Sequence, residues 1–450
     1  MKRSWTSGAG DVSSLEFVIH RFLPGHDQDP GDRETFADLE IRVGDRPITE
    51  VEDTLAGSVG SSIFVPALPL ARWLIVNWWR LRWEAAPAVE RSRARAWKRA
   101  HNLAAIGGDY AWPALELVSD GEYVRASMEA EEAPDMAAIR YLRSVRVNIP
   151  AIHFEQAVDR FTDEVLARLA IRLKDEMELT ELKEELALER SNPDLARECK
   201  LQALAGIHPG EAGADWLREV GLLQGQTGKT AIHEVLSALN GSEFGPKDAE
   251  AALQQLRRSR ERISLDWLRE AKASCGEVST GGEKAWDRGY RLARKLRAAF
   301  GIPSGPVSNR KLEELLHLKL PIEAAETQGF RLQGGVRGDS GADAAIALSS
   351  FGIERQRFAC ARLIACAVES APQEPLLPVL DAGTALQKTE RAFAQEFLCP
   401  WEDLNAFFAD TGYGEVAFEK AARYFNVSER VIDFSLVNHG KVSSYQTALY

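Results

Sequence analysis

The segment 357–369 constrains the fold of this chain more than any other stretch of the sequence. It contains no glycine or proline, and its apolar residues recur at the spacing of an α-helix. The apolar stripe is broad, which is typical of a helix that other elements cover on most sides. The stripe consists of Phe358, Ala361, Leu363, Ile364 and Val368. The sequence therefore predicts a buried helix here, around which a hydrophobic core is built.

Length and composition limit the number of domains, the kinds of partner and the cellular compartment that the chain can have. A chain of 450 residues is too long for one ordinary core, so we expect about two to four domains. The formal net charge of −12 argues against nucleic-acid binding by the whole surface, although it leaves a local basic patch open. Five cysteines without a Cys-x-x-Cys pair suit free thiols in a reducing compartment. We expect no signal peptide and no membrane span, and hence a cytoplasmic protein.

Residues 1–145 are expected to form a tryptophan-rich domain that contains β-strands. The alternating pattern of 36–51 predicts a hairpin with a Gly-Asp turn, and that of 115–127 predicts a second hairpin with an Asp-Gly turn. Between the two hairpins, residues 71–83 predict one helix that carries tryptophans along its apolar side.

The segment 78–101 interleaves arginines with tryptophans, and two interpretations of it are open. Arginines can contact phosphates while indoles stack on exposed bases, as in proteins that bind single-stranded nucleic acid. The residues that would contact nucleic acid are Arg91, Arg93, Arg95 and Arg99. Alternatively, the tryptophans anchor a core and the arginines cover a solvated helix face. The tryptophans follow the apolar stripe more closely than the basic run, which favours this second interpretation.

Two motif-like segments in the helical middle of the chain lack residues that their chemistry needs. The segment 225–230 is similar to a phosphate-binding loop, but Leu223 stands where that motif requires its first glycine. We therefore predict a structural turn and a helix start. His233 and Glu234 begin like a zincin motif, but Ser237 stands where the second histidine would be, so the pair cannot chelate a metal.

The last third of the chain carries several motifs in a consistent order. They comprise a predicted amphipathic helix at 286–297, the buried helix at 357–369, a helix that ends at a proline at 391–400, and a closing segment at 421–440. In order and spacing these segments resemble the ImmA/IrrE family of bacterial metallopeptidases, whose zinc helix has the pattern R-F-x-x-A-H-E-x-x-H. The resemblance implies a zincin-like domain with a small sheet packed over that helix. The family includes stress- or defence-linked proteases that cut repressor-like proteins.

Aligned on that pattern, the chain lacks the family's catalytic residues. Arg362 and Cys366 stand where the family has its two histidines, and Leu363 stands where it has its catalytic glutamate. A guanidinium has no lone pair to offer a metal, and a leucine cannot accept a proton from water. Glu390 lies one position from the family's third ligand, but one thiol and one carboxylate beside a cation make a poor zinc site. We therefore expect no metal, no cofactor and no catalytic residue.

Two related questions concern the side chains at these positions. Arg362 could pair with Glu390 inside the domain or with an acidic group of a bound peptide, and internal pairing is the simpler arrangement. Cys360 and Cys366 lie on different faces of the predicted helix. We therefore expect these cysteines to act as small buried apolar residues.

The sequence thus predicts an α+β protein that is mostly helical. We expect a β-containing tryptophan-rich domain at 1–145, a helical middle domain at 146–280 and an ImmA/IrrE-like pseudopeptidase domain at 281–450. The leading functional hypothesis is a non-enzymatic bacterial protein that binds a protein partner in regulation or phage defence. One alternative is association with nucleic acid through residues 78–101, and another is an enzyme with an unrecognised site in the N-terminal domain.

Overall fold

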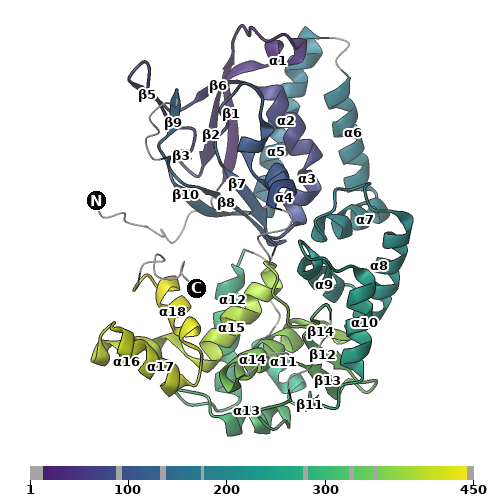
Figure 1. Cartoon of the computed structure of the whole chain (residues 1–450), viewed down its shortest axis with the longest axis vertical. Coiled ribbons are helices and arrows are strands. Elements are labelled where there is room, and N and C mark those ends of the chain that lie inside the picture. Colours follow the sequence, from purple (N-terminus) through teal and green to yellow (C-terminus); the bar gives the residue numbers. More distant parts are fainter. Residues whose placement is uncertain are drawn as a thin grey trace. The chain divides into compact units, whose positions relative to one another are not determined.

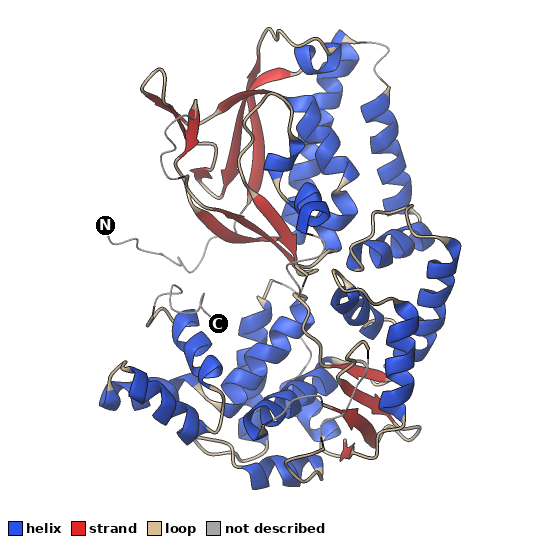
Figure 2. Cartoon of the chain, viewed as in Figure 1, coloured by secondary structure: helices blue, strands red, loops and turns tan. Residues whose placement is uncertain are grey.

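The computed structural model describes residues 14–87, 94–131, 138–173, 177–276, 282–323, 329–348 and 352–442. The chain forms two compact units, Met1–Gly213 and Ala214–Tyr450. The structure is 52% helix and 16% strand, with the strands in four small antiparallel sheets, which confirms the predicted mostly helical α+β class (Figures 1 and 2). Among the described residues, no helix has the length and apolar character that crossing a bilayer requires.

Three of the antiparallel sheets belong to the first unit. The first sheet contains β1 (Leu15–Phe22), β2 (Phe36–Val43), β3 (Arg46–Pro47) and β6 (Ile63–Pro66). The second contains β7 (Glu116–Ser119), β8 (Tyr123–Met128) and β10 (Val145–Pro150), and the third contains β4 (Val51–Asp53), β5 (Ser58–Gly60) and β9 (Ile139–Tyr141). Both predicted hairpins are confirmed, because β2 pairs with β3 across the Gly-Asp turn and β7 pairs with β8 across the Asp-Gly turn.

The helices of the first unit build its core against these sheets. The long helix α5 (Ala151–Arg172) packs on β1 and α2 and buries Phe154 and Phe161. The other helices are α1 (Pro30–Glu34), α2 (Ala67–Val76), α3 (Trp78–Trp83), α4 (Ala94–His101), the 3-10 helix η1 (Leu103–Ile106), α6 (Glu178–Ser191) and α7 (Pro193–Leu204). Trp73, Trp78 and Trp79 lie in the same buried cluster as the α5 phenylalanines, so these indoles act as core anchors.

The helix predicted over residues 71–83 is interrupted at Asn77, which separates α2 from α3. The Asn77 side chain donates from Nδ2 to the carbonyl oxygen of Trp73 at 2.9 Å, and its backbone leaves helical geometry with φ −96° and ψ 8°. Asparagine side chains compete with the backbone for such carbonyls, which is why they favour helix ends over helix interiors. The prediction of one continuous helix was therefore wrong at this residue.

The second unit contains the fourth sheet, with strand order β11-β13-β12-β14, and most of the helices. The strands are β11 (Arg262–Ser264), β12 (Gly334–Arg337), β13 (Asp343–Ala347) and β14 (Leu376–Pro378). The helices are α8 (Ala214–Thr227), α9 (Ala231–Leu239), α10 (Pro246–Arg257), α11 (Leu268–Cys275), α12 (Ala285–Ala299), α13 (Asn309–Leu316), α14 (Ile353–Glu369), α15 (Ala385–Leu398), α16 (Trp401–Thr411), α17 (Glu415–Phe425) and α18 (Glu429–Asn438). The segment 146–280 thus contributes α5–α7 to the first unit and α8–α11 to the second.

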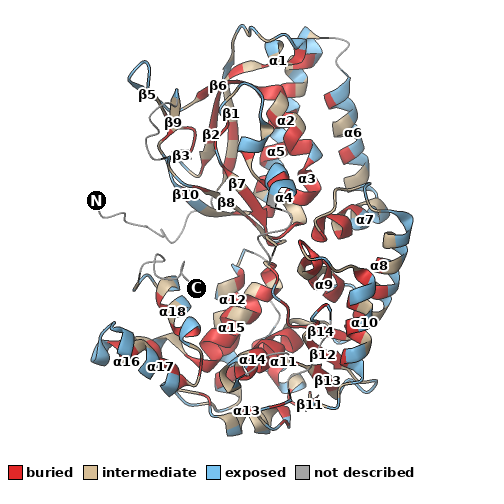
Figure 3. Cartoon of the chain, viewed as in Figure 1, coloured by how far each residue is buried: buried red, intermediate tan, exposed pale blue. Residues whose placement is uncertain are grey.

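Helix α14 is the centre of the second unit, as its apolar stripe predicts. Its residues from Ala359 to Val368 are buried (Figure 3), and Leu363 lies in one hydrophobic cluster with Ile346 of β13 and Leu377 of β14. The prediction of a buried helix is confirmed, and the helix packs against the small sheet. At its C-terminus, Lys272 donates to the carbonyl oxygen of Ser370 at 2.6 Å, which places a cation where the helix dipole favours one.

Helices α12 and α15 approach each other closely beside α14. Gly289 of α12 makes this possible, because a Cβ at that position would lie 2.4 Å from the carbonyl oxygen of Thr389 and 2.8 Å from the Cβ of Ala392. Only glycine fits such a contact without moving one of the two helices. Both helices of this pair pack against α14.

Buried Arg357 ties α14 to two other segments of the second unit. Its side chain is fully buried, and it donates from Nε to the carbonyl oxygen of Asn426 at 2.9 Å and from Nη2 to that of Val307 at 2.6 Å. It also donates to the side-chain oxygen of Asn309. Charge-assisted bonds of this kind fix the start of α13 and the α17–α18 turn against the central helix.

Candidate functional site: a buried polar cluster on the central helix

The structure places the sequence-predicted site residues of α14 in the interior of the second unit. Leu363 and Cys366 are fully buried, and Arg362 is 7% exposed. One turn of helix carries Arg362 and Cys366 toward α15, whereas Leu363 faces the sheet in the hydrophobic cluster. A catalytic base at the Leu363 position would have no water to activate, because apolar side chains surround it.

The guanidinium of Arg362 is bonded inside the protein. From Nη2 it donates to the carbonyl oxygen of Leu380 at 2.5 Å and to the side-chain oxygen of Gln387, and it lies 3.4 Å from Oε2 of Glu390. The Nη1 atom of Arg362 lies 3.6 Å from Oδ1 of the exposed carboxylate of Asp381. Of the two arrangements expected for Arg362, the structure shows the internal pair with Glu390. The same guanidinium cannot also be free to receive an acidic group of a peptide.

Burial shifts the ionisation of both groups that face Arg362. It raises the pKa of Glu390 to about 8, against the opposing charge of Arg362, and neighbouring Glu234 adds to the rise. It also raises the pKa of the Cys366 thiol well above its ordinary value, with the carboxyl of Glu390 acting in the same direction. A thiol of this kind stays protonated at neutral pH and is a poor nucleophile and a poor metal ligand.

Glu234 enters the same cluster from α9, far away in the sequence. Its side chain is 4% exposed, and Thr384 at the start of α15 donates to its Oε2 at 2.6 Å. Burial raises the pKa of Glu234 to about 7, although hydrogen bonds from Thr384 and Gln387 act to lower it. In the sequence, Glu234 stands out only as part of an incomplete zincin motif. No local pattern indicates that α9 reaches the start of α15.

Arg391 supplies a second cation beside Glu234 and Glu390. It donates from Nη2 to the carbonyl oxygen of Ala382 at 2.8 Å. Burial and the nearby charge of Arg362 lower its pKa to about 10. We call the set Glu234, Arg362, Cys366, Gln387, Glu390 and Arg391 the buried polar cluster. The raised pKa values of Glu234 and Glu390 mean that both carboxyl groups are protonated to a large extent at neutral pH, which lowers the cost of burying them.

The buried polar cluster does not fit a zinc ion. Zinc sites in proteins use three or four imidazole, thiolate or carboxylate ligands around one point. Here the two guanidinium groups repel a cation, and the buried polar cluster offers one thiol and no imidazole. Across the part of the chain that the structure describes, no three His, Cys, Asp or Glu side chains are arranged to hold a metal. All five cysteines of the chain are free and buried, as expected for apolar core residues.

Within the phosphate-loop-like segment, residues 225–227 end α8 and residues 228–230 form the turn that leads into α9, so the predicted turn and helix start are confirmed. The backbone N–H groups of Lys229 and Thr230 each donate to Oε1 of Glu374 at 3.1 Å, and that of Ala231 donates to Oε2 at 3.4 Å. A carboxylate of the protein thus occupies the positive end of the α9 dipole. Gly228 has φ +106°, and a Cβ there would lie 1.8 Å from Oε2 of Glu374, so only glycine allows this contact.

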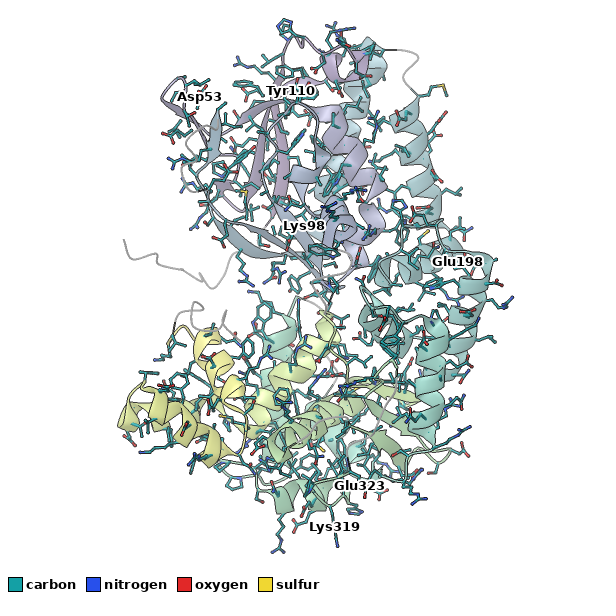
Figure 4. All side chains as sticks on the ribbon, in the orientation of Figure 1. Asp53, Lys98, Tyr110, Glu198, Lys319 and Glu323 are labelled. Carbon is teal, nitrogen blue, oxygen red and sulfur yellow. The ribbon has the colours of Figure 1, made fainter. Side chains whose placement is uncertain are left out.

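The basic segment of the first unit is described in part. Arg91 and Arg93 lie outside the described residues, whereas Arg95 and Arg99 are exposed on α4. Lys98 of the same helix is exposed as well and is labelled in Figure 4. Within the described ranges, no acidic side chain forms an ion pair with any of these three cations. The neighbouring Trp97 is partly buried and stacks on His101 at 4.5 Å between ring centroids. The α4 surface therefore offers cations rather than free aromatic rings.

Comparison of the chain with protein-family models, with curated proteins and with solved structures finds no match.

Proposed function

We propose that the second unit contains a catalytically silent, ImmA/IrrE-like pseudopeptidase domain that binds a protein partner in bacterial regulation or phage defence. The observation that carries the proposal is the position of Arg362. In the alignment with the family pattern, Arg362 stands at the position of the first zinc-binding histidine, and its guanidinium contacts Leu380, Gln387 and Glu390. A buried helix packed against a small sheet, with a polar network in place of zinc ligands, supports the proposal.

A partner of such a domain has to bind on its outer surface, because Glu234, Cys366 and Glu390 are buried. The aromatic ladder Tyr413–Phe408–Phe407–Tyr424, across α16 and α17, is a candidate contact. Tyr413 stacks on Phe408 at 5.2 Å, and Tyr424 stacks on Phe407 at 5.7 Å. The two tyrosines at its ends are 46% and 54% exposed. Exposed tyrosines on a rigid aromatic base are typical of protein interfaces.

Quantitative co-purification of the full chain from cells of its own source tests this proposal. The variant Tyr413→Ser/Tyr424→Ser removes both exposed ends of the ladder, and Leu222→Ser on α8, which is 59% exposed, is the matched control. We expect one protein to be retained in stoichiometric amount by the unchanged chain and by the control, and to be lost with the double variant. Purification of the unchanged chain without any partner contradicts the proposal.

A second candidate function is contact with nucleic acid through α4. Arg95, Lys98 and Arg99 are exposed within two turns of one helix, and this observation favours a polyanionic partner. Because Trp73, Trp78 and Trp79 are buried, this contact would involve phosphates rather than stacked bases.

Salt dependence tests the second candidate. If all three cations contact phosphates of a single strand, the logarithm of affinity should fall against the logarithm of salt with a slope of about −2. Charge reversal of Arg95, Lys98 and Arg99 to glutamate should abolish that binding. The matched control is charge reversal of Arg310, Lys420 and Arg423, which are exposed in the second unit. Equal binding by both triple variants excludes α4 as the contact.

A further inference from the structure

Four polar side chains share the outer face of the β7–β8–β10 sheet in the first unit. Side chains alternate between the two faces of a strand, and the core side of this sheet holds Val124, Ala126 and Ile149, which are fully buried. The alternate residues of β8 and β10 therefore point outward. Among them are the residues that we call the sheet-face cluster, namely Arg125, Ser127, Arg146 and Asn148.

The strand register brings the two arginines of the cluster within reach of one small ligand. Arg125 of β8 lies directly opposite Asn148 of β10, and Ser127 lies directly opposite Arg146. The two guanidinium groups thus extend from diagonal positions of neighbouring strands, whose Cβ atoms are about 7–8 Å apart in an antiparallel sheet. A hydroxyl and an amide occupy the other diagonal, so four hydrogen-bond donors border the same small area.

Arg125 has a guanidinium without hydrogen-bond acceptors. Its Nε is buried without a partner, and the carboxylate of Glu116 lies 3.9 Å from its Nη2, which is beyond hydrogen-bond distance. Among the described residues, Arg72 and Arg362 also have a buried Nε without a partner, but both donate from Nη2 to an acceptor. Arg125 makes no such bond, so its charge is the least satisfied of the three.

The other members of the cluster leave this charge uncompensated. The Arg125 side chain is 31% exposed, and both burial and the neighbouring charge of Arg146 lower its pKa. Arg146 is exposed, and in the described part of the chain no carboxylate pairs with it. The side chains of Ser127 and Asn148 likewise form no hydrogen bond there. An orphaned donor and two adjacent like charges are both unfavourable, and one bound anion would relieve both.

We propose that the sheet-face cluster binds the phosphate group of a small phosphate monoester, which Arg125 and Arg146 contact through their guanidinium groups. Guanidinium donors match phosphate oxygens in pairs, and two of them balance the charge of about −2 that a monoester carries above its second pKa of about 6. A phosphodiester of a nucleic-acid strand carries one charge and fits this pair less well. The inference concerns the first unit and depends neither on the pseudopeptidase proposal nor on contact of α4 with nucleic acid.

Calorimetric titration of the full chain tests the inference at about pH 8, where a phosphate monoester is a dianion. The probe is methyl phosphate, and dimethyl phosphate serves as the matched diester, with ionic strength held constant by sodium chloride. We expect saturable binding of methyl phosphate at one site per chain. Dimethyl phosphate should bind at least about tenfold more weakly, because it lacks one charge and one free oxygen for a charge-assisted hydrogen bond.

Two double variants assign the binding to the sheet-face cluster. Arg125→Gln/Arg146→Gln should weaken the binding of methyl phosphate by at least about tenfold, because it removes the charge-assisted hydrogen bonds. The matched control is Arg140→Gln/Arg143→Gln, which removes two arginines of the same unit that are paired with Glu52 and Glu50. The control should bind methyl phosphate as the unchanged chain does.

Thermal unfolding without phosphate provides a second measurement. Arg125→Gln/Arg146→Gln should unfold at the same temperature as the unchanged chain or at a higher one, because it removes two adjacent like charges, so its loss of binding does not reflect unfolding. Three results would overturn the inference. They are absence of saturable methyl phosphate binding to the unchanged chain, equal binding by the two double variants, and equal affinity for methyl phosphate and dimethyl phosphate.

Discussion

Replacing Arg362 with leucine should strongly destabilise the second unit. The substitution leaves three buried acceptors, the Leu380 carbonyl, the Gln387 side-chain oxygen and Glu390, without the donor that they share. A buried acceptor that loses its partner costs about 1–3 kcal/mol, and breaking a buried ion pair from one side costs about 3–5 kcal/mol in total. We therefore expect the free energy of unfolding to fall by about 3–5 kcal/mol for Arg362→Leu, measured by urea denaturation at about pH 9, where Glu390 is ionised.

A double variant and a surface control make this prediction specific. Arg362→Leu/Glu390→Leu removes both charges, and it should recover most of the loss because apolar side chains can replace a buried ion pair at little cost. Arg310→Leu breaks the exposed pair of Arg310 with Glu314, and it should change stability by about 0.5 kcal/mol or less. If Arg362→Leu is as mild as Arg310→Leu, or if the double variant is worse than the single one, the account of the buried polar cluster is wrong.

Three further predictions concern pH, close packing and the α9 turn. The pKa of Glu390 is raised from 4.5 to about 8, so its contribution to the free energy of unfolding is complete below pH 4.5 and is lost as pH rises toward 8. Glu390→Gln should flatten this decline when urea denaturation is measured at a series of pH values. An unchanged dependence of stability on pH contradicts the assignment. Gly289→Ala should cost about 1–3 kcal/mol in urea denaturation because its Cβ would clash with α15, whereas Gly221→Ala, which has open space on α8, should be neutral or stabilising. Glu374→Gln should lower the thermal midpoint of the second unit and reduce its free energy of unfolding by about 1–2 kcal/mol, because an amide cannot replace a carboxylate at three backbone N–H groups. An unchanged midpoint would exclude a stabilising role for Glu374 at the start of α9.

Local patterns in the sequence predict those parts of the fold that depend on neighbouring residues. The apolar stripe of 357–369 predicts buried helix α14, and the Gly-Asp and Asp-Gly turns predict two hairpins of the first unit. The missing glycine at Leu223 is enough to rule out a phosphate loop. The break at Asn77 was missed, since the apolar periodicity continues through it while the side chain bonds to the Trp73 carbonyl.

The buried polar cluster depends on contacts between distant segments, which no local pattern reports. Arg362 and Glu390 could be considered together because the family resemblance aligns both positions. Glu234 could not, because it reaches Thr384 only through the packing of α9 beside α15. The carboxylate that fills the α9 turn, Glu374, is distant in the same way. The sequence therefore draws attention to Arg362, Cys366 and Glu390, whereas only the structure shows the contacts that their side chains make.

Metal content tests the central claim most directly. The full chain, produced in zinc-supplemented medium and passed through gel filtration, would be analysed for metal by mass spectrometry, with Cys366→Ser measured in parallel. Because Arg362 cannot ligate a metal and Cys366 is the single thiol of the buried polar cluster, we expect no stoichiometric zinc in either protein. One zinc per chain that survives gel filtration, and that is lost in Cys366→Ser, would show that the centre is a metal site and would contradict the account.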